Sequence, residues 1–282
     1  MARTRTMAGP KLPSSLPTSA RQLVDVLSRP GPYRVLRGDL GLVGIPGVIF
    51  TPTEGLGLPA VAFGHDWMQH PDRYLSLLRH LASWGIVAAA PSSQCGPLPS
   101  HTRFSADLRT ALDVCVGVRL GDGAISVDRQ RLALAGHGTG GGCAVLAATG
   151  RAEDESVAAV VTLALAETWP SAIDAARTVT APALHLAAGK DQVSPPAAGA
   201  EPVAETWGGP VTLRRLPKAN HLGFLDGWMW FDALLAGGPQ ASTARLTRSL
   251  MTGFLLHQLV GEHRCAQLTT GRVKGTTVEL SR

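Results

Sequence analysis

The chain has 282 residues, 45% apolar and 17% charged, a composition that indicates a globular protein with a substantial core and excludes a largely disordered one. The net charge is +5, and the first 37 residues hold seven Lys and Arg against one acid, so the remainder of the chain is close to neutral. No basic stretch is interleaved with aromatic residues, so we expect no nucleic-acid partner. No apolar run reaches the roughly 18 to 20 residues of a membrane span, and the basic start lacks the apolar segment of a secretory signal. These features predict a cytoplasmic protein without a membrane span.

Residues 1–30 are rich in Pro, Ser and Arg and predict a flexible basic arm with a short helix near Ala20–Leu27. Neither a repeat nor a linker divides residues 31–282, which we expect to form a single domain. The four cysteines are widely spaced without a C-x-x-C pair, which indicates free thiols and gives no sign of a zinc site.

From Tyr33 onward, short apolar or alternating segments between Gly and Pro predict eight strands, at residues 33–39, 45–53, 58–66, 86–91, 131–138, 157–166, 182–189 and 211–216. Apolar residues at helical spacing predict helices at 72–85, 105–120, 139–150 and 241–261. Because helices alternate with apolar strands, the pattern indicates an α/β fold with a mostly parallel sheet of the eight-stranded type and helices on both faces. The first two strands resemble a hairpin and predict an antiparallel edge.

The polar groups that follow these strands indicate where chemistry would occur, because functional side chains gather at the carboxyl ends of parallel strands. The third strand is followed by GHDWMQ, the fifth by GHGTGGG, and the last two by KDQVSP and KANHLGF. Gly138, Asp191 and His221 therefore follow one another in the nucleophile, acid, base order of G-x-S-x-G hydrolases. The nucleophile position itself is a glycine.

From about Val48 to Gly261 the chain resembles α/β-hydrolases of the group that holds cutinases, polyester (PET) hydrolases and platelet-activating-factor acetylhydrolase-like esterases. The resemblance lies in LASWGIVAAAP, SVDRQRLALAGHGTGGG, KANHLGF and LTRSLMTGFLLHQLVGE, and in the stretch from Glu167 to Pro195. The elbow of that group typically reads GHSMGG, so Gly138 stands where its serine belongs.

The resemblance implies that Asp191 orients the imidazole of His221, which would be the general base. It also implies that the backbone N–H groups of Trp67 and Thr139 form the oxyanion hole, with no cofactor required. By the same resemblance, the substrate-binding residues are Trp169, which matches a tryptophan of the substrate cleft, and Asp66, where the group generally has a small residue.

Each of these assignments has a plain alternative. The loops of Asp191 and His221 could be ordinary turns, and Trp67 and Trp169 could be packing residues. A carboxylate at Asp66 would oppose oxyanion stabilisation if it faced the site, but not if it faced solvent. The residues His65, Asp66 and His137 could be imagined as metal ligands, although their spacing matches no known site, and we expect none.

Glycine in place of serine affects both the backbone conformation at position 138 and the chemistry of the site. The elbow position requires positive φ, which glycine adopts without strain, so Gly138 preserves the turn. Glycine offers no attacking atom, and Thr139 lies past the apex of the turn. Three functions fit this pattern: a non-catalytic protein that binds an acyl or ester-like ligand or a protein partner, a hydrolase that activates water with His221 and Asp191, and an ordinary esterase in which glycine replaces a natural serine.

Overall fold

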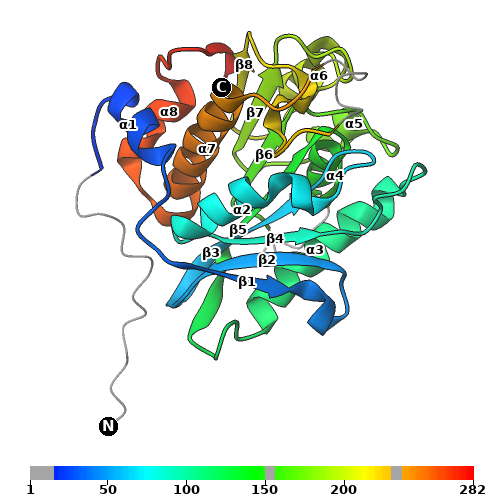
Figure 1. Cartoon of the computed structure of the whole chain (residues 1–282). Helices are drawn as coiled ribbons and strands as arrows, with labels where there is room; N and C mark the ends of the chain where they lie inside the picture. The colour runs from blue at the N-terminus through cyan, green and yellow to red at the C-terminus, as the bar shows by residue number, and fades with distance from the viewer. Residues whose placement is uncertain (1–15, 150–155, 230–236) are drawn as a thin grey trace.

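One nine-stranded sheet forms the centre of the protein, in the order β1-β2-β4-β3-β5-β6-β7-β8-β9 (Figure 1). The computed structural model describes residues 16–149, 156–229 and 237–282. The six strands from β4 to β8 in this order are parallel, whereas β1, β2 and β9 pair antiparallel at the two edges. The strands are β1 (Val35–Asp39), β2 (Gly47–Pro52), β3 (Gly55–Gly64), β4 (Val87–Pro91), β5 (Ile125–His137), β6 (Ala159–Leu163), β7 (Ala183–Ala188), β8 (Val211–Leu216) and β9 (Thr277–Ser281).

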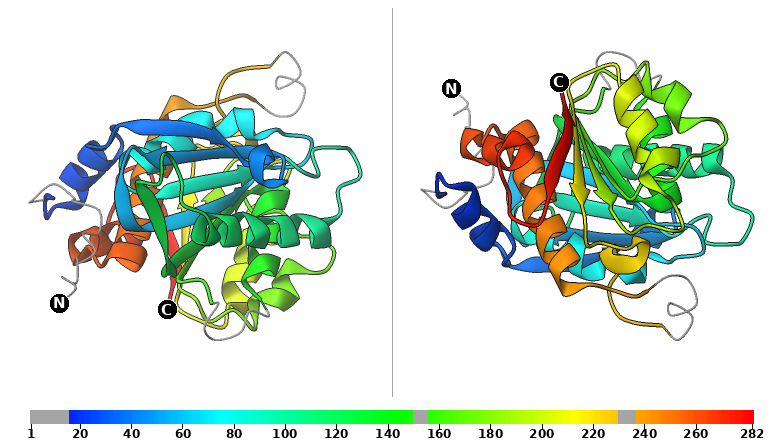
Figure 2. Two further views of the ribbon diagram at one scale, coloured as in Figure 1. Left: turned by 90° about the horizontal axis from the view of Figure 1, so that it is seen from below. Right: turned by 90° about the horizontal axis from the view of Figure 1, so that it is seen from above.

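Helices cover both faces of this sheet, as the two end-on views of Figure 2 show. One core contains side chains of α1 (Ala20–Leu27), α2 (Leu75–Ser83), α7 (Ala241–Leu255) and α8 (Ala266–Thr270). The other contains side chains of α3 (His101–Gly117), α4 (Gly138–Ala148), α5 (Ala172–Ala176) and α6 (Ala200–Thr206). The predicted α/β fold with a mostly parallel sheet is thus confirmed, and its arrangement is compatible with that of α/β-hydrolases.

Strand β3 shows why the apolar runs become central strands. Val61 and Phe63 enter one core, whereas Ala60 and Ala62 enter the other, and all four are fully buried. A strand buried on both faces has no polar position, so its sequence is continuously apolar. The small alanines let helices pack closely on one side, while Phe63 fills the other.

The structure departs from the predicted elements at the end of the chain. The predicted strands were eight, but β9 adds a ninth along β8, and its mostly exposed TVELS sequence carries no apolar run that would mark it. The long closing helix ends as α-helix at Leu255 and continues as one π-helical segment, Leu256–Val260, before Gly261.

Helix α1 occupies the predicted Ala20–Leu27 and buries Leu23, Val24 and Leu27 in the core shared with α7. This part of the predicted arm therefore packs on the sheet's helical layer, whereas residues 1–15 lie outside the described residues. All four cysteines are free, as expected. None of the helices in the described part of the chain combines the length and apolar character that crossing a membrane requires.

Candidate functional site

The elbow between β5 and α4 has the backbone conformation that the sequence predicts. His137 ends β5, and Gly138 starts α4 with φ +51°, in the left-handed region. Two residues later, a Cβ on Gly140 would lie 2.3 Å from the carbonyl oxygens of Gly64 and His65. Because Gly140 has no side chain, the start of α4 can approach the end of β3, which brings the loop after β3 against the elbow.

Asp191 and His221 meet beside this elbow, on the loops after β7 and β8. His221 Nδ1 donates to Asp191 Oδ2 at 2.7 Å, and both side chains are almost completely buried. The other carboxylate oxygen of Asp191 accepts the backbone N–H groups of Val193 (2.9 Å) and Ser194 (2.8 Å). These bonds fix the carboxylate in the turn, so it can hold the imidazole in one orientation.

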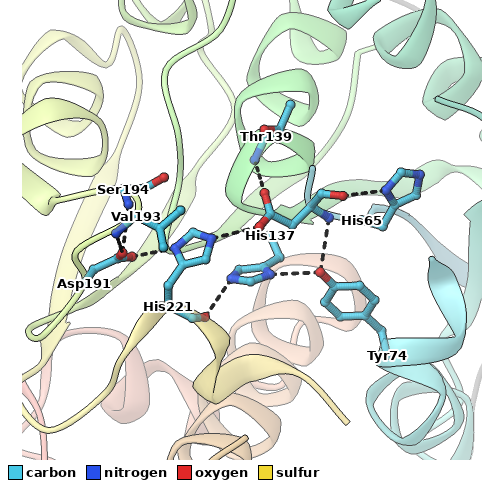
Figure 3. A network of polar contacts seen from close by, with 9 residues as sticks. His65, Tyr74, His137, Thr139, Asp191, Val193, Ser194 and His221 are labelled. Atoms are coloured by element: carbon cyan, nitrogen blue, oxygen red, sulfur yellow. Dashed lines mark hydrogen bonds and ion pairs between the residues drawn. The ribbon is translucent and has the colours of Figure 1, made fainter. Parts of the chain in front are cut away.

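Asp66 occupies the space beside Gly138. Figure 3 labels its hydrogen-bond partners His221, Thr139 and Tyr74. Asp66 Oδ2 accepts a hydrogen bond from His221 Nε2 at 2.8 Å, and its Oδ1 accepts the backbone N–H of Thr139 at 2.8 Å. A Cβ placed on Gly138 would lie 1.9 Å from Asp66 Oδ1, well inside van der Waals contact. The carboxylate therefore faces the site, not solvent, and fills the volume where a side chain at position 138 would stand.

The charges of this arrangement depend on one another. Burial lowers the pKa of His221, but the hydrogen bonds and negative charges of Asp191 and Asp66 outweigh it and raise that pKa to about 9. Burial raises the pKa of Asp66, but the hydrogen bond and the positive charge of His221, together with the hydrogen bond from the Thr139 N–H, bring it down to about 2. At neutral pH, His221 is therefore an imidazolium held between two carboxylates.

This protonation state limits what the site can do. Both ring nitrogens of His221 donate to a carboxylate, so neither has a lone pair to accept a proton from water. The amide of Thr139, the predicted oxyanion donor, is already bound to an anion. Asp191, His221 and the Thr139 amide lie together in the structure, and the Asp66 carboxylate accepts hydrogen bonds from both the imidazole and the amide.

Tyr74 and His137 support Asp66 from the other side. The Asp66 N–H donates to the Tyr74 hydroxyl at 3.1 Å, and that hydroxyl lies 2.9 Å from His137 Nδ1. His137 Nε2 lies 3.0 Å from the carbonyl oxygen of His221, which can only accept, so we assign the proton to Nε2 and the lone pair to Nδ1. Burial is the main cause that lowers the pKa of His137, to about 4, which agrees with this neutral ring. These hydrogen bonds form a relay from the Asp66 N–H through Tyr74 and His137 to the carbonyl oxygen of His221. The relay connects the loop after β3 with the loop after β8.

The three residues considered above as metal ligands, His65, Asp66 and His137, do not form one cluster of ligand atoms. His65 Nδ1 bonds to the carbonyl oxygen of Asp66, so its ring points away from the carboxylate. The three ligand atoms that do lie within 4.8 Å of one another belong to Asp66, His137 and His221. Their nitrogens are already engaged, those of His221 by two carboxylates and those of His137 by Tyr74 and a carbonyl group, so a cation bound there would have to displace these hydrogen bonds.

The two predicted tryptophans lie on exposed loops. Trp67 directly follows Asp66, is 48% exposed, and donates its indole N–H to the Pro97 carbonyl. Trp169 is 85% exposed, and its backbone N–H donates to His101 Nδ1. Other exposed apolar side chains share the loops that follow parallel strands, and we name the whole set the mouth rim: Trp67, Met68, Leu98, Trp169, Val193, Trp228 and Met229.

Tyr74 was not predicted as a site residue. Its position in an apolar, helix-forming stretch resembles that of any core aromatic, and only its hydroxyl bonds distinguish it. No model of a known protein family matches the chain, and no curated protein matches it significantly.

Proposed function

We propose that the chain is an α/β-hydrolase-like protein, with a site of the cutinase and polyester-hydrolase type, that lacks acyl-transfer activity and acts by binding. The observation that carries this proposal is the position of Asp66. Its carboxylate supplies the negative charge that an oxyanion would carry, to the same amide and beside the same imidazole. A site built to stabilise charge that develops in a reaction gains nothing when that charge is permanently present.

Activation of water by His221 is the main rival, and the same geometry opposes it. A water near Gly138 would have to displace Asp66 from His221 Nε2, and His221 would have to lose its proton. A general base works best with a pKa near the working pH, whereas the two carboxylates hold this one at about 9.

A parent protein with serine at position 138 is the third alternative. Serine there would place its Cβ on top of Asp66 Oδ1, so Asp66 would have to leave both His221 and Thr139. Gly138 and Asp66 fit each other, which favours a site that has glycine as its own residue.

The binding role is supported by the mouth rim. Seven large apolar side chains are exposed on loops that follow parallel strands, and Trp is among the residues that contribute most to interfaces. Because Asp66 fills the centre of the site, we favour a protein partner that contacts the rim over a small acyl ligand that enters the site.

The decisive experiment compares labelling by a fluorophosphonate probe and hydrolysis of p-nitrophenyl butyrate in four proteins: wild type, Gly138→Ser, Asp66→Gly, and the double variant. We expect labelling and turnover only in the double variant, which has both a nucleophile and a free amide. His221→Ala added to the double variant should abolish them, and thermal unfolding checks that each variant is folded.

Two outcomes would contradict the proposal. Turnover by the wild type that disappears in His221→Ala would establish the water-activated hydrolase. Strong labelling of Gly138→Ser alone, equal to that of the double variant, would show that Asp66 does not block the site and would favour the serine parent.

A further inference from the structure

A groove on the far side of the helical layer from the elbow lies between α1, α7 and the segment that leads into β9. Its volume is about 1040 Å³, just above the roughly 300–1,000 Å³ of small-molecule sites. Figures 1 and 2 show α1 and α7 side by side at this place, with the chain passing through α8 into β9 beside them. None of the residues predicted for catalysis or substrate binding lines the groove.

The floor of the groove is apolar. Apolar residues line it: Val24 of α1 and Val273 are buried, and Leu246 of α7 is half-buried. Gly275 turns with φ +90°, and a Cβ there would lie 3.3 Å from Leu246 Cδ1, so the segment passes close over this leucine. Leu246 is the half-buried member of this floor, so an alkyl chain laid over it would cover apolar surface that is open to water in the free protein.

The walls of the groove are cationic. Arg21, Arg245, Arg272 and Lys274 all line it, against the single carboxylate of Asp25. Arg245 pairs with Asp25 across α1 and α7, whereas the other three cations form no ion pair with any residue that the structure describes. Like charges gathered around one hollow repel each other, and a bound anion would relieve this repulsion.

The segment that carries Arg272 and Lys274 is held by a buried arginine. Arg214 of β8 is fully buried and donates to the Thr269 and Gly271 carbonyl oxygens at 2.9 and 2.8 Å, and to Thr276 Oγ1 at 2.6 Å. These bonds fix the segment on both sides of the two cations. A wall that is already ordered loses little entropy when a ligand binds.

We propose that this groove binds a single-chain anionic amphiphile of the fatty-carboxylate class, with its alkyl chain on Val24, Leu246 and Val273 and its head group among the cations. The apolar floor requires a chain and the cationic walls require an anion, so neither a simple anion nor a neutral hydrocarbon satisfies both. The segment 1–15 is not a complementary occupant, since it carries three basic residues and no acidic one. This site is independent of the elbow and of its proposed function.

The test is isothermal titration of the whole protein with dodecanoate below its micellar concentration, alongside acetate and dodecyltrimethylammonium. We expect saturable binding of dodecanoate only. Arg272→Glu with Lys274→Glu should weaken it by about tenfold or more, since 1.4 kcal/mol of lost attraction is tenfold in affinity. The matched control Arg103→Glu with Arg119→Glu makes the same change in net charge at two exposed positions outside the groove and should leave binding unchanged.

Leu246→Ser distinguishes the contribution of the alkyl chain to binding from that of the head group, because it should reduce the difference in affinity between dodecanoate and octanoate. Circular dichroism checks that this variant and the Arg272→Glu, Lys274→Glu variant remain folded. Equal binding of the cationic amphiphile, an equal loss in the control, or no saturable binding by the wild type would overturn the proposal. So would equal competition by an oligoglutamate peptide, which would identify an acidic protein partner, or a dimer in sedimentation that dodecanoate does not dissociate.

Discussion

The ion pairs of His221 with Asp191 and Asp66 predict how stability depends on pH. The pKa of His221 is about 9 in the folded protein against 6.5 for an ordinary histidine, and the side chain is 1% exposed, so solvent screening is small. This difference corresponds to about 3 kcal/mol of free energy of unfolding. Because the folded pKa is the higher one, this stabilisation is fully present below pH 6.5 and is lost as the pH rises through about 9.

Asp66→Asn tests this reasoning by removing one of the two charges while keeping the shape of the side chain. Asp191 alone must then offset the burial of His221, so the pKa of His221 should fall. The loss of unfolding free energy between pH 6 and pH 10 should shrink from about 3 kcal/mol to less than half of that. Urea unfolding at a series of pH values measures this loss, and NMR titration of the His221 ring measures its pKa directly.

The control is Asp174→Asn, which removes a carboxylate whose side chain is 79% exposed and which lies outside the site. It should retain the pH dependence of the wild type, including the contributions of all other groups that titrate above pH 8. If Asp66→Asn shows the same loss as the wild type, and His221 titrates unchanged, the charge of Asp66 does not act on the imidazole and the description of the site is wrong.

Three further predictions concern stability. Gly138→Ser should lower the free energy of unfolding by about 1–3 kcal/mol from positive φ, with a further loss because Asp66 must leave its partners; chemical denaturation should show that adding Asp66→Gly recovers part of this loss. Tyr74→Phe leaves the Asp66 N–H and His137 Nδ1 without their partner and should cost about 1–3 kcal/mol, so a change under about 0.5 kcal/mol in urea unfolding would refute the relay. Arg214→Met should speed hydrogen exchange in β9 more than in β3, because the bonds that anchor the preceding segment are lost; equal protection in both strands would count against that anchoring role.

The fold was predictable because most strands are buried on both faces. Continuous apolar runs such as the one around Val61 have no other stable position in a chain of this size, and each is followed by a turn. Strand β9 was not predictable in this way, because it lies at an exposed edge and its pairing with β8 depends on contacts far apart in the sequence. The short helices α5 and α6 were also missed, since five to seven residues are too few to show a helical period.

The site was predictable only as far as the order of loops along the sheet determines it. Asp191 and His221 follow neighbouring parallel strands, so their loops meet whatever the details of the side chains. The orientation of Asp66 depends on the approach of α4 to β3 and on the space left by Gly138, neither of which a local sequence pattern specifies. The Tyr74 hydroxyl is similarly defined only by partners from distant segments.

Gly138 and Asp66 are best understood as one structural feature. With glycine at position 138 and no carboxylate at position 66, the buried His221 Nε2 and the neighbouring Thr139 amide would have no partner, and buried polar groups without partners are costly. The Asp66 carboxylate satisfies both and adds an ion pair, but it fits only where position 138 has no side chain. A serine introduced at position 138 alone would therefore lack space, and a glycine introduced at position 66 alone would leave space without a nucleophile. Each of the two residues therefore constrains what the other position can hold, and together they keep His221 and the Thr139 amide paired.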